Sequence, residues 1–185
     1  MTTSPAAGSA PVVDLGAWLA PTFMSHYREN LLEHVFVAEV LQECAFVRHQ
    51  KVEVLRAEVD DGGYDLVFQL GDIVRHVQLK TRSKKGRARK VQVNANLEKH
   101  LGGCVVWMFW DVDPSTERAC LTYRWSGNNP RQRTKSLPDT VGRHTRGGGE
   151  RPNMRVMKWG DFDPPEGTID TAALVKLLFG PPAKK

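Results

Sequence analysis

The chain has 185 residues, of which 41% are hydrophobic and 25% are charged, and its formal net charge is +5. This length suffices for one sizeable hydrophobic core and is short for two, so we expect a single domain. No apolar run approaches the roughly 20 residues that span a bilayer, and the N-terminus lacks the pattern of a signal peptide, which predicts a cytoplasmic protein with no membrane partner.

The first half of the chain predicts an arm, a helix and three strands. Residues 1–20 are rich in Ala, Ser, Thr, Pro and Gly, which indicates a flexible N-terminal arm. Residues 25–46 are expected to form a helix. The segments 51–59, 64–70 and 73–81 then alternate apolar and polar residues with period two, as strands do.

The middle of the chain continues with a helix and two strands. After a basic loop, residues 91–101 suit a short helix that Gly102 and Gly103 would close. Residues 104–111, "CVVWMFWD", are apolar on both faces, which is typical of a central strand that is covered on both sides. Residues 119–125 alternate again and predict another strand.

The last third predicts a loop, a strand and a helix. Residues 126–153 are rich in Gly, Pro, Asn and Arg, which indicates a long surface loop. Residues 154–159 suit an edge strand, and residues 168–180 suit a final helix with Thr168 or Asp170 near its N-cap.

The order of these elements predicts an α/β fold of the sandwich type. A central mixed sheet would have helices on both of its faces. We expect one domain over residues 21–180, with its core in residues 25–125 and a C-terminal strand and helix in residues 154–180.

A tight hairpin would bring three polar side chains together. If Gly71 and Asp72 are the central residues of a type II′ turn, Asp65 lies directly opposite Gln78. Opposed residues share a face of the sheet at a Cβ separation of about 4.5–5.5 Å, and Lys80 becomes the diagonal neighbour of Asp65. The sequence therefore predicts an acid, an amide and an amine within reach of one small ion or water molecule.

A glutamate on the first helix is a fourth candidate. At about 100° per residue, Glu33 falls among Val37, Val40 and Cys44 on an apolar stripe. A carboxylate in such a place is costly unless it has a partner. Two interpretations stay open: Glu33 joins the polar group of the hairpin, or it either merely lies at the edge of the stripe or pairs with a nearby arginine.

These residues resemble the PD-(D/E)xK nuclease superfamily, and most closely its Mrr-like restriction endonuclease-type domains. The resemblance rests on Glu33 in "EHVFVAEVL", Asp65 in "GYDLVF" and the triplet Gln78-x-Lys80, in which glutamine replaces the second acid. It covers roughly residues 33–111. It implies a restriction-endonuclease-like αβββαβ core and a metal-dependent endonuclease that hydrolyses phosphodiester bonds of DNA, in restriction or defence.

The resemblance also implies roles for individual residues. Asp65 would be the principal ligand of Mg²⁺, the side chain of Gln78 or the backbone carbonyl of Leu79 would supply another oxygen, and Glu33 would contact the metal directly or through water. Lys80 would either help to deprotonate the attacking water or stabilise the transition state. Because Gln78 is uncharged, we expect a millimolar Mg²⁺ requirement or a preference for Mn²⁺.

A basic run follows the candidate motif. Between Arg75 and Lys90, eight of sixteen residues are Lys or Arg and none is acidic. A charge run alone is typical of a solvated loop. Beside a nuclease site it would hold the phosphate backbone without sequence preference. The predicted nucleic-acid contacts are Arg82, Lys84, Lys85, Arg87, Arg89 and Lys90.

Alternatives of another class remain. The same fold can serve as a nucleic-acid-binding module that has lost catalysis, which the neutral Gln78 favours, or as an RNA nuclease. The sequence contains no recognisable reader module, so specificity would come from loops such as residues 126–153 or from a partner. The protein partners left open are a second copy of the chain, in a homodimer, and a separate specificity partner.

Cysteine and histidine patterns exclude the common soft metal sites. The three cysteines, Cys44, Cys104 and Cys120, are odd in number and lack Cys-x-x-Cys spacing, so reduced thiols are expected. The six histidines include no His-x-x-x-His pair. Any metal must therefore be held by oxygen.

Overall fold

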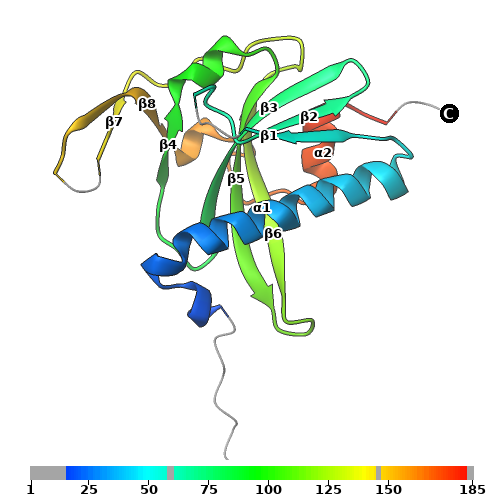
Figure 1. Cartoon of the computed structure of the whole chain (residues 1–185), viewed down its shortest axis with the longest axis horizontal. Coiled ribbons are helices and arrows are strands. Elements are labelled where there is room, and N and C mark those ends of the chain that lie inside the picture. Colours follow the sequence, from blue (N-terminus) through cyan, green and yellow to red (C-terminus); the bar gives the residue numbers. More distant parts are fainter. Residues whose placement is uncertain (1–15, 58–60, 145–146, 183–185) are drawn as a thin grey trace, which may run out of the picture.

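The computed structural model describes residues 16–57, 61–144 and 147–182, and Figure 1 shows the chain as two sheets of unequal size with helices. The expected N-terminal arm falls mostly on residues 1–15, which lie outside the described residues. Its last part is folded: residues 17–19 form a short 3-10 helix, and Leu19 is buried.

The larger sheet has five strands and is mixed. Its strands in spatial order are β1 (Glu53–Arg56), β2 (Leu66–Leu70), β3 (Ile73–Ser83), β5 (Gly103–Asp113) and β6 (Arg118–Gly127). Only the central pair, β3 and β5, is parallel. The mixed α/β class expected from the sequence is thus confirmed.

Both α-helices cover the same face of this sheet. α1 (Ser25–Gln42) continues through a π-helical turn to Val47, and α2 (Thr171–Phe179) follows all strands in the chain. Side chains of both helices, such as Phe36 and Leu178, pack in one cluster with the sheet residue Phe68. The side chain of Asp170 caps α2 by accepting from the Ala173 N–H, so of the two expected N-cap residues Asp170 is the one observed and Thr168 is not.

A second sheet covers the other face. It consists of β4 (Lys90–Asn94), β8 (Glu150–Lys158) and β7 (Val141–Arg143), all antiparallel, and in Figure 1 it stands to one side of the larger sheet. Val93 and Trp107 belong to the hydrophobic cluster between the two sheets. The expectation of helices on both faces is therefore wrong, because a sheet replaces the second helical layer.

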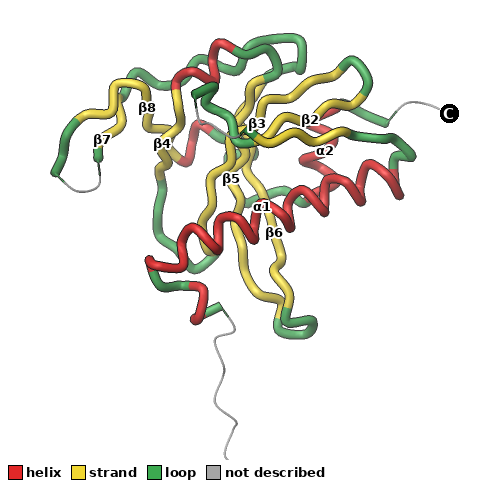
Figure 2. Tube along the Cα trace, viewed as in Figure 1, coloured by secondary structure: helices red, strands yellow, loops and turns green. Residues whose placement is uncertain are grey.

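The helix expected at residues 91–101 is also wrong. Residues 90–94 form β4 and residues 95–99 form the short 3-10 helix η4, as the strand and helix colours of Figure 2 show. The pattern Val-Gln-Val-Asn alternates β-branched and polar residues, and Val93 is fully buried against β5, so strand packing outweighs the helix signal. Asn94 then ends the strand, since its side chain accepts from the Asn96 N–H and caps η4.

The long loop expected at residues 126–153 is only partly a loop. It contains β7 and the first residues of β8, which pair from Arg143↔Glu150 onward. Gly147, Gly148 and Gly149 lie in the connection between these strands. The glycine-rich segment thus closes a hairpin of the second sheet.

The hairpin of β2 and β3 has the predicted register. Leu70 pairs with Ile73 and Leu66 pairs with Val77, so Gly71 and Asp72 are the two central turn residues. Gly71 has φ +61°, as the first central position of a type II′ turn requires.

No helix in the described part of the chain is both long and apolar enough to cross a membrane.

Candidate active site

The candidate site lies just before the first residue of β2, where β3 extends past Val77 without β2 as its neighbour. The Asp65 N–H donates to the Val77 carbonyl at 2.9 Å, and beyond this point one carboxylate oxygen of Asp65 accepts from the Leu79 N–H at 2.5 Å. In a strand, the N–H and C=O of one residue point to the same side. The Leu79 carbonyl therefore projects from the same edge of the sheet as the Asp65 carboxylate.

A cavity of about 430 Å³ opens at this edge. Asp65, Leu79 and Lys80 line it from the hairpin, Glu33 lines it from α1, and Gln92 lines it from β4. The cavity thus lies between the helical layer and the second sheet. Three of the four predicted catalytic residues, Glu33, Asp65 and Lys80, come together here although they are far apart in the sequence.

Gln78 is not among the residues that line this cavity. Its side chain is buried at 1% exposure, and its Oε1 accepts from the Asn94 N–H at 2.9 Å. Gln78 and Lys80 share the sheet face that the second sheet covers, as period two requires. The Gln78 side chain therefore joins β3 to the end of β4. Two oxygens are predicted to replace the second acid, that of the Gln78 side chain and that of the Leu79 backbone. Of these two residues, Leu79 is the one that lines the cavity.

Glu33 has a partner. Its carboxylate forms an ion pair with the Arg56 Nε of β1 at 2.9 Å, and its side chain is 23% exposed. The interpretation that pairs Glu33 with an arginine is thus the one observed, and Glu33 still lines the cavity. A metal ion at the site would compete with Arg56 for this carboxylate, whereas a phosphate would compete with the carboxylate for Arg56.

One face of α1 contributes further polar groups that were not predicted. His26, Glu29 and Asn30 line the cavity beside Glu33. Their separations of seven, four and three residues from Glu33 place them on the same side of a helix. That spacing is the sequence signal that identifies them.

The donors at this edge suit a hard cation. They are the Asp65 carboxylate and the Leu79 carbonyl, with Glu33 nearby, and oxygen is the ligand that Mg²⁺ prefers. Among the residues described, no three His, Cys, Asp or Glu side chains are grouped closely enough to hold a metal by themselves. The set therefore fits an ion that keeps several waters and takes further oxygens from a phosphate.

Tyr64, which precedes Asp65, belongs to a ring cluster next to the site. Its ring centroid lies 4.8 Å from that of His76 and 5.0 Å from that of His100. Burial lowers the pKa of His76, while its hydrogen bond to the Leu101 carbonyl acts in the opposite direction. The lowered pKa favours the neutral imidazole, so His76 serves packing rather than phosphate binding at neutral pH.

The first predicted phosphate contact, Arg82, is largely engaged within the protein. Its guanidinium lies 4.9 Å from the ring centroid of Phe109 and 5.5 Å from that of Trp159, and it donates to the carbonyls of Ser83 and Ala88. Burial and the neighbouring Arg89 lower the pKa of Arg82. Arg82 therefore fixes the path of the basic segment.

The remaining basic residues differ in their surroundings. Arg89 stacks on Trp159 at 4.7 Å, and Lys84 Nζ lies 4.0 Å from the sulfur of Cys120. Arg87 is exposed, and Lys90 is exposed at the start of β4. The structure thus spreads this charge along the surface between β3 and the second sheet.

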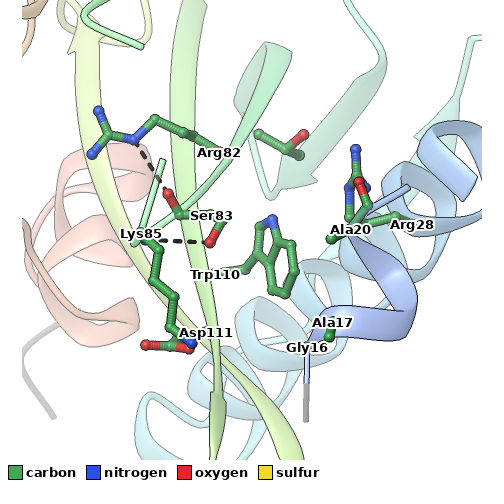
Figure 3. Close-up of a pocket in the computed structure, with 10 residues that line it drawn as sticks. Gly16, Ala17, Ala20, Arg28, Arg82, Ser83, Lys85, Trp110 and Asp111 are labelled. Carbon is green, nitrogen blue, oxygen red and sulfur yellow. Dashed lines mark hydrogen bonds between the residues drawn. The ribbon is translucent and has the colours of Figure 1, made fainter. Parts of the chain in front are cut away.

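A smaller cavity of about 290 Å³ adjoins the site at Thr81, which lines both. Figure 3 shows Arg82 and Ser83 on one side of it and Arg28 of α1 on the other, with Lys85 extending toward Asp111. Arg28 also donates to the Leu19 carbonyl, which holds the N-terminal 3-10 helix against α1.

The cysteines have no role at the site. All three are free; Cys44 and Cys104 are buried, and Cys120 is half-buried. Burial raises the pKa of Cys104 to about 12, so it stays an unreactive thiol.

Searches of protein-family models and of curated proteins found no match to this chain. The likeness to PD-(D/E)xK nucleases therefore stays a prediction, and the function is argued from the residues of the site.

Proposed function

We propose that this protein is a metal-dependent endonuclease that hydrolyses phosphodiester bonds of DNA. The observation that carries the proposal is the meeting of Asp65, Lys80 and Glu33 in one cavity at the open edge of β3. A carboxylate, an ammonium group and a second carboxylate around one cavity are groups that phosphodiester hydrolysis needs. A cytoplasmic location, as expected from the sequence, belongs to the same proposal.

The metal ion would supply a polarised water and a positive charge opposite the phosphate oxygens. Asp65 would hold it together with the Leu79 carbonyl, and the hydrogen bond from the Leu79 N–H keeps the carboxylate oriented. Glu33 would act from the opposite wall of the cavity, held in place by Arg56.

Lys80 has two roles open to it, and one variant separates them. A charged ammonium stabilises the negative charge that develops on the phosphate, whereas a neutral amine accepts a proton from the attacking water. Lys80→Arg retains the charge and cannot act as a base. Retained cleavage in this variant excludes the base and assigns the electrostatic role, whereas lost cleavage with retained DNA binding shows that the charge alone does not suffice.

The second candidate function is a nucleic-acid-binding module without catalysis. Two observations favour it: the Gln78 oxygen is engaged by the Asn94 N–H, and Glu33 is already paired with Arg56. Both reduce the number of ligands that the chain offers to a metal.

Plasmid nicking in Mg²⁺, Mn²⁺ and EDTA tests the choice. Asp65→Asn keeps an acceptor for the Leu79 N–H but removes the charge, and Lys80→Ala removes the ammonium. We expect metal-dependent nicking by the wild type and a loss of about 10²-fold or more in each variant. Asp72→Asn, at the exposed turn of the same hairpin, and Lys176→Ala, exposed on α2, are the matched controls and should cleave normally.

The outcomes separate the candidates. Binding of DNA by the wild type with no cleavage in any divalent ion supports the binding module. Single-stranded DNA and RNA in parallel reactions define the substrate, and preferential cleavage of RNA would replace DNA in the proposal. Nicking that persists in both Asp65→Asn and Lys80→Ala would place the active site elsewhere.

A further inference from the structure

A larger cavity lies on the second sheet beside the candidate active site. Its volume is about 1010 Å³, and its lining comes from β4, β7, β8 and the residues next to them, with Lys80 reaching in from β3. Small-molecule sites usually occupy about 300–1,000 Å³. This cavity therefore lies at the upper end of that range.

The charge of the lining is strongly positive. Five cationic side chains and one carboxylate line it: Lys80, Lys90, Arg143, Arg151, Lys158 and Glu150. The carboxylate of Glu150 lies 3.7 Å from Arg143, and both side chains are largely exposed. The lining thus keeps an excess of positive charge around one space.

Two of these lysines are direct partners on neighbouring strands. Lys90 of β4 pairs directly with Lys158 of β8, and both are exposed. Like charges directly opposite each other destabilise an antiparallel pair. A polyanion lying over the pair would remove this repulsion, so the arrangement indicates a ligand with several negative charges.

The floor of the cavity favours a ligand held by its backbone. Val91, Val141, Met154 and Val156 provide its apolar surface, and among the described lining residues there is no aromatic ring on which a base could stack. Charged groups around an aliphatic floor suit sugar and phosphate rather than base recognition.

The large cavity adjoins the candidate active site. Lys80, Val91 and Gln92 line both cavities. The Gln92 Nε2 donates to the Arg143 carbonyl at 2.7 Å, which ties β4 to β7 at the junction. A strand held over the second sheet would therefore reach Lys80, which also lines the candidate active site.

We propose that this large cavity, the trough, binds the sugar–phosphate backbone of the nucleic acid on one side of the bond that is cleaved. The inference rests on the proposed nuclease function and adds Arg143, Arg151 and Lys158 to the substrate-binding residues. The second sheet thus acts as a substrate platform that the basic segment alone does not provide.

Binding without cleavage tests the trough. Affinity for labelled duplex and single-stranded DNA is measured by fluorescence anisotropy in EDTA over a range of salt concentrations. The variants are Lys158→Glu and Arg151→Gln, and the control is Lys176→Glu on α2. Each lost phosphate contact should lower the log–log salt slope by about 0.9 on duplex or about 0.7 on a single strand.

Lys158→Glu gives a second, opposite readout. It replaces the repulsion with Lys90 by an attraction, so its melting temperature should rise while its DNA affinity falls. A purely structural role for Lys158 predicts a change in melting temperature with unchanged affinity. Arg151→Gln tests the same trough without altering this pair.

Wild-type affinity and salt slope in both variants, or no DNA binding by the wild type at low salt, would overturn the trough. Failure of the proposed function looks different. In that case the wild type binds DNA, Lys158→Glu weakens the binding, and no divalent ion produces cleavage. Cleavage by the wild type with normal binding in both variants overturns the trough alone.

Discussion

The Gln78 amide oxygen accepts a hydrogen bond from the Asn94 N–H at the point where β4 ends and η4 begins. This N–H belongs to the backbone of a buried residue, Asn94. A buried donor that loses a hydrogen-bond acceptor lowers the free energy of unfolding. At the scale of single residues, this position in the motif therefore serves the fold.

Gln78→Ala should lower the free energy of unfolding by about 1–3 kcal/mol, because it leaves the Asn94 N–H without this acceptor. Urea denaturation measures the change. Gln69→Ala on the exposed face of β2 is the control and should alter stability by no more than about 0.5 kcal/mol. Equal stability of the Gln78 variant and the wild type would contradict the role assigned to the amide.

The sequence identifies some site residues better than others for a physical reason. Asp65 and Lys80 belong to one hairpin whose turn residues determine the register, so their proximity follows from local rules. The partners of Glu33 and Gln78, which are Arg56 and Asn94, lie on other elements. Such contacts depend on tertiary packing, which periodicity does not specify.

At the scale of elements, the close approach of η4 and the loop before β2 depends on a glycine. Gly63 has φ +76°, and a Cβ there would lie 2.8 Å from the Leu97 backbone nitrogen. A side chain at this position would meet both an unfavourable backbone conformation and a clash with backbone. Gly71 has a similar φ of +61° but open space around it, so the two positions form a matched pair.

Gly71→Ala should lower the free energy of unfolding by about 1–2 kcal/mol, since only the positive φ of this position is unfavourable for alanine. Gly63→Ala should cost clearly more, because the Leu97 backbone must also move. Thermal unfolding of both variants gives the comparison. Equal melting temperatures would show that the contact between the loop and η4 relaxes without cost.

The elements differ in how far the sequence predicts them. The hairpin of β2 and β3 and the helix α2 follow from turn and capping residues. β4 does not, because a run of five residues with two valines fits both a strand and the first turn of a helix. Its pairing with β8, some sixty residues later, decides the outcome.

At the scale of the whole molecule, α2 is joined to the sheet by a buried arginine. Arg75 of β3 donates to the carbonyls of Leu177 and Leu178 and to that of Asn128, at 2.7–2.8 Å. Cations near the C-terminal carbonyls of a helix are favourable. Although Arg75 begins the basic run in the sequence, its charge is used inside the fold.

Arg75→Leu should lower the free energy of unfolding by about 2–4 kcal/mol, because three carbonyls lose a charged donor together. Arg118→Leu, at an exposed position of β6, is the control and should have little effect. Denaturant unfolding followed by tryptophan fluorescence gives both values. A stable Arg75 variant would mean that packing alone holds α2.

The mixed main sheet could be predicted from the sequence, whereas the second sheet could not. The three strands of the second sheet come from segments on either side of β5 and β6. The glycine-rich composition between β7 and β8 resembles that of a loop. Closing such a sheet depends on contacts between distant segments, which a local pattern does not contain.

The hydrogen bond between Asp65 and the Leu79 N–H has a consequence for self-association. The open edge of β3 beyond Val77 is a place where a strand from another molecule could add. The Asp65 carboxylate already accepts from the Leu79 N–H, with which such a strand would pair, and it places negative charge there. Asp65→Ala should therefore form oligomers that Asp65→Asn does not, and size-exclusion chromatography at increasing concentration would reveal the difference.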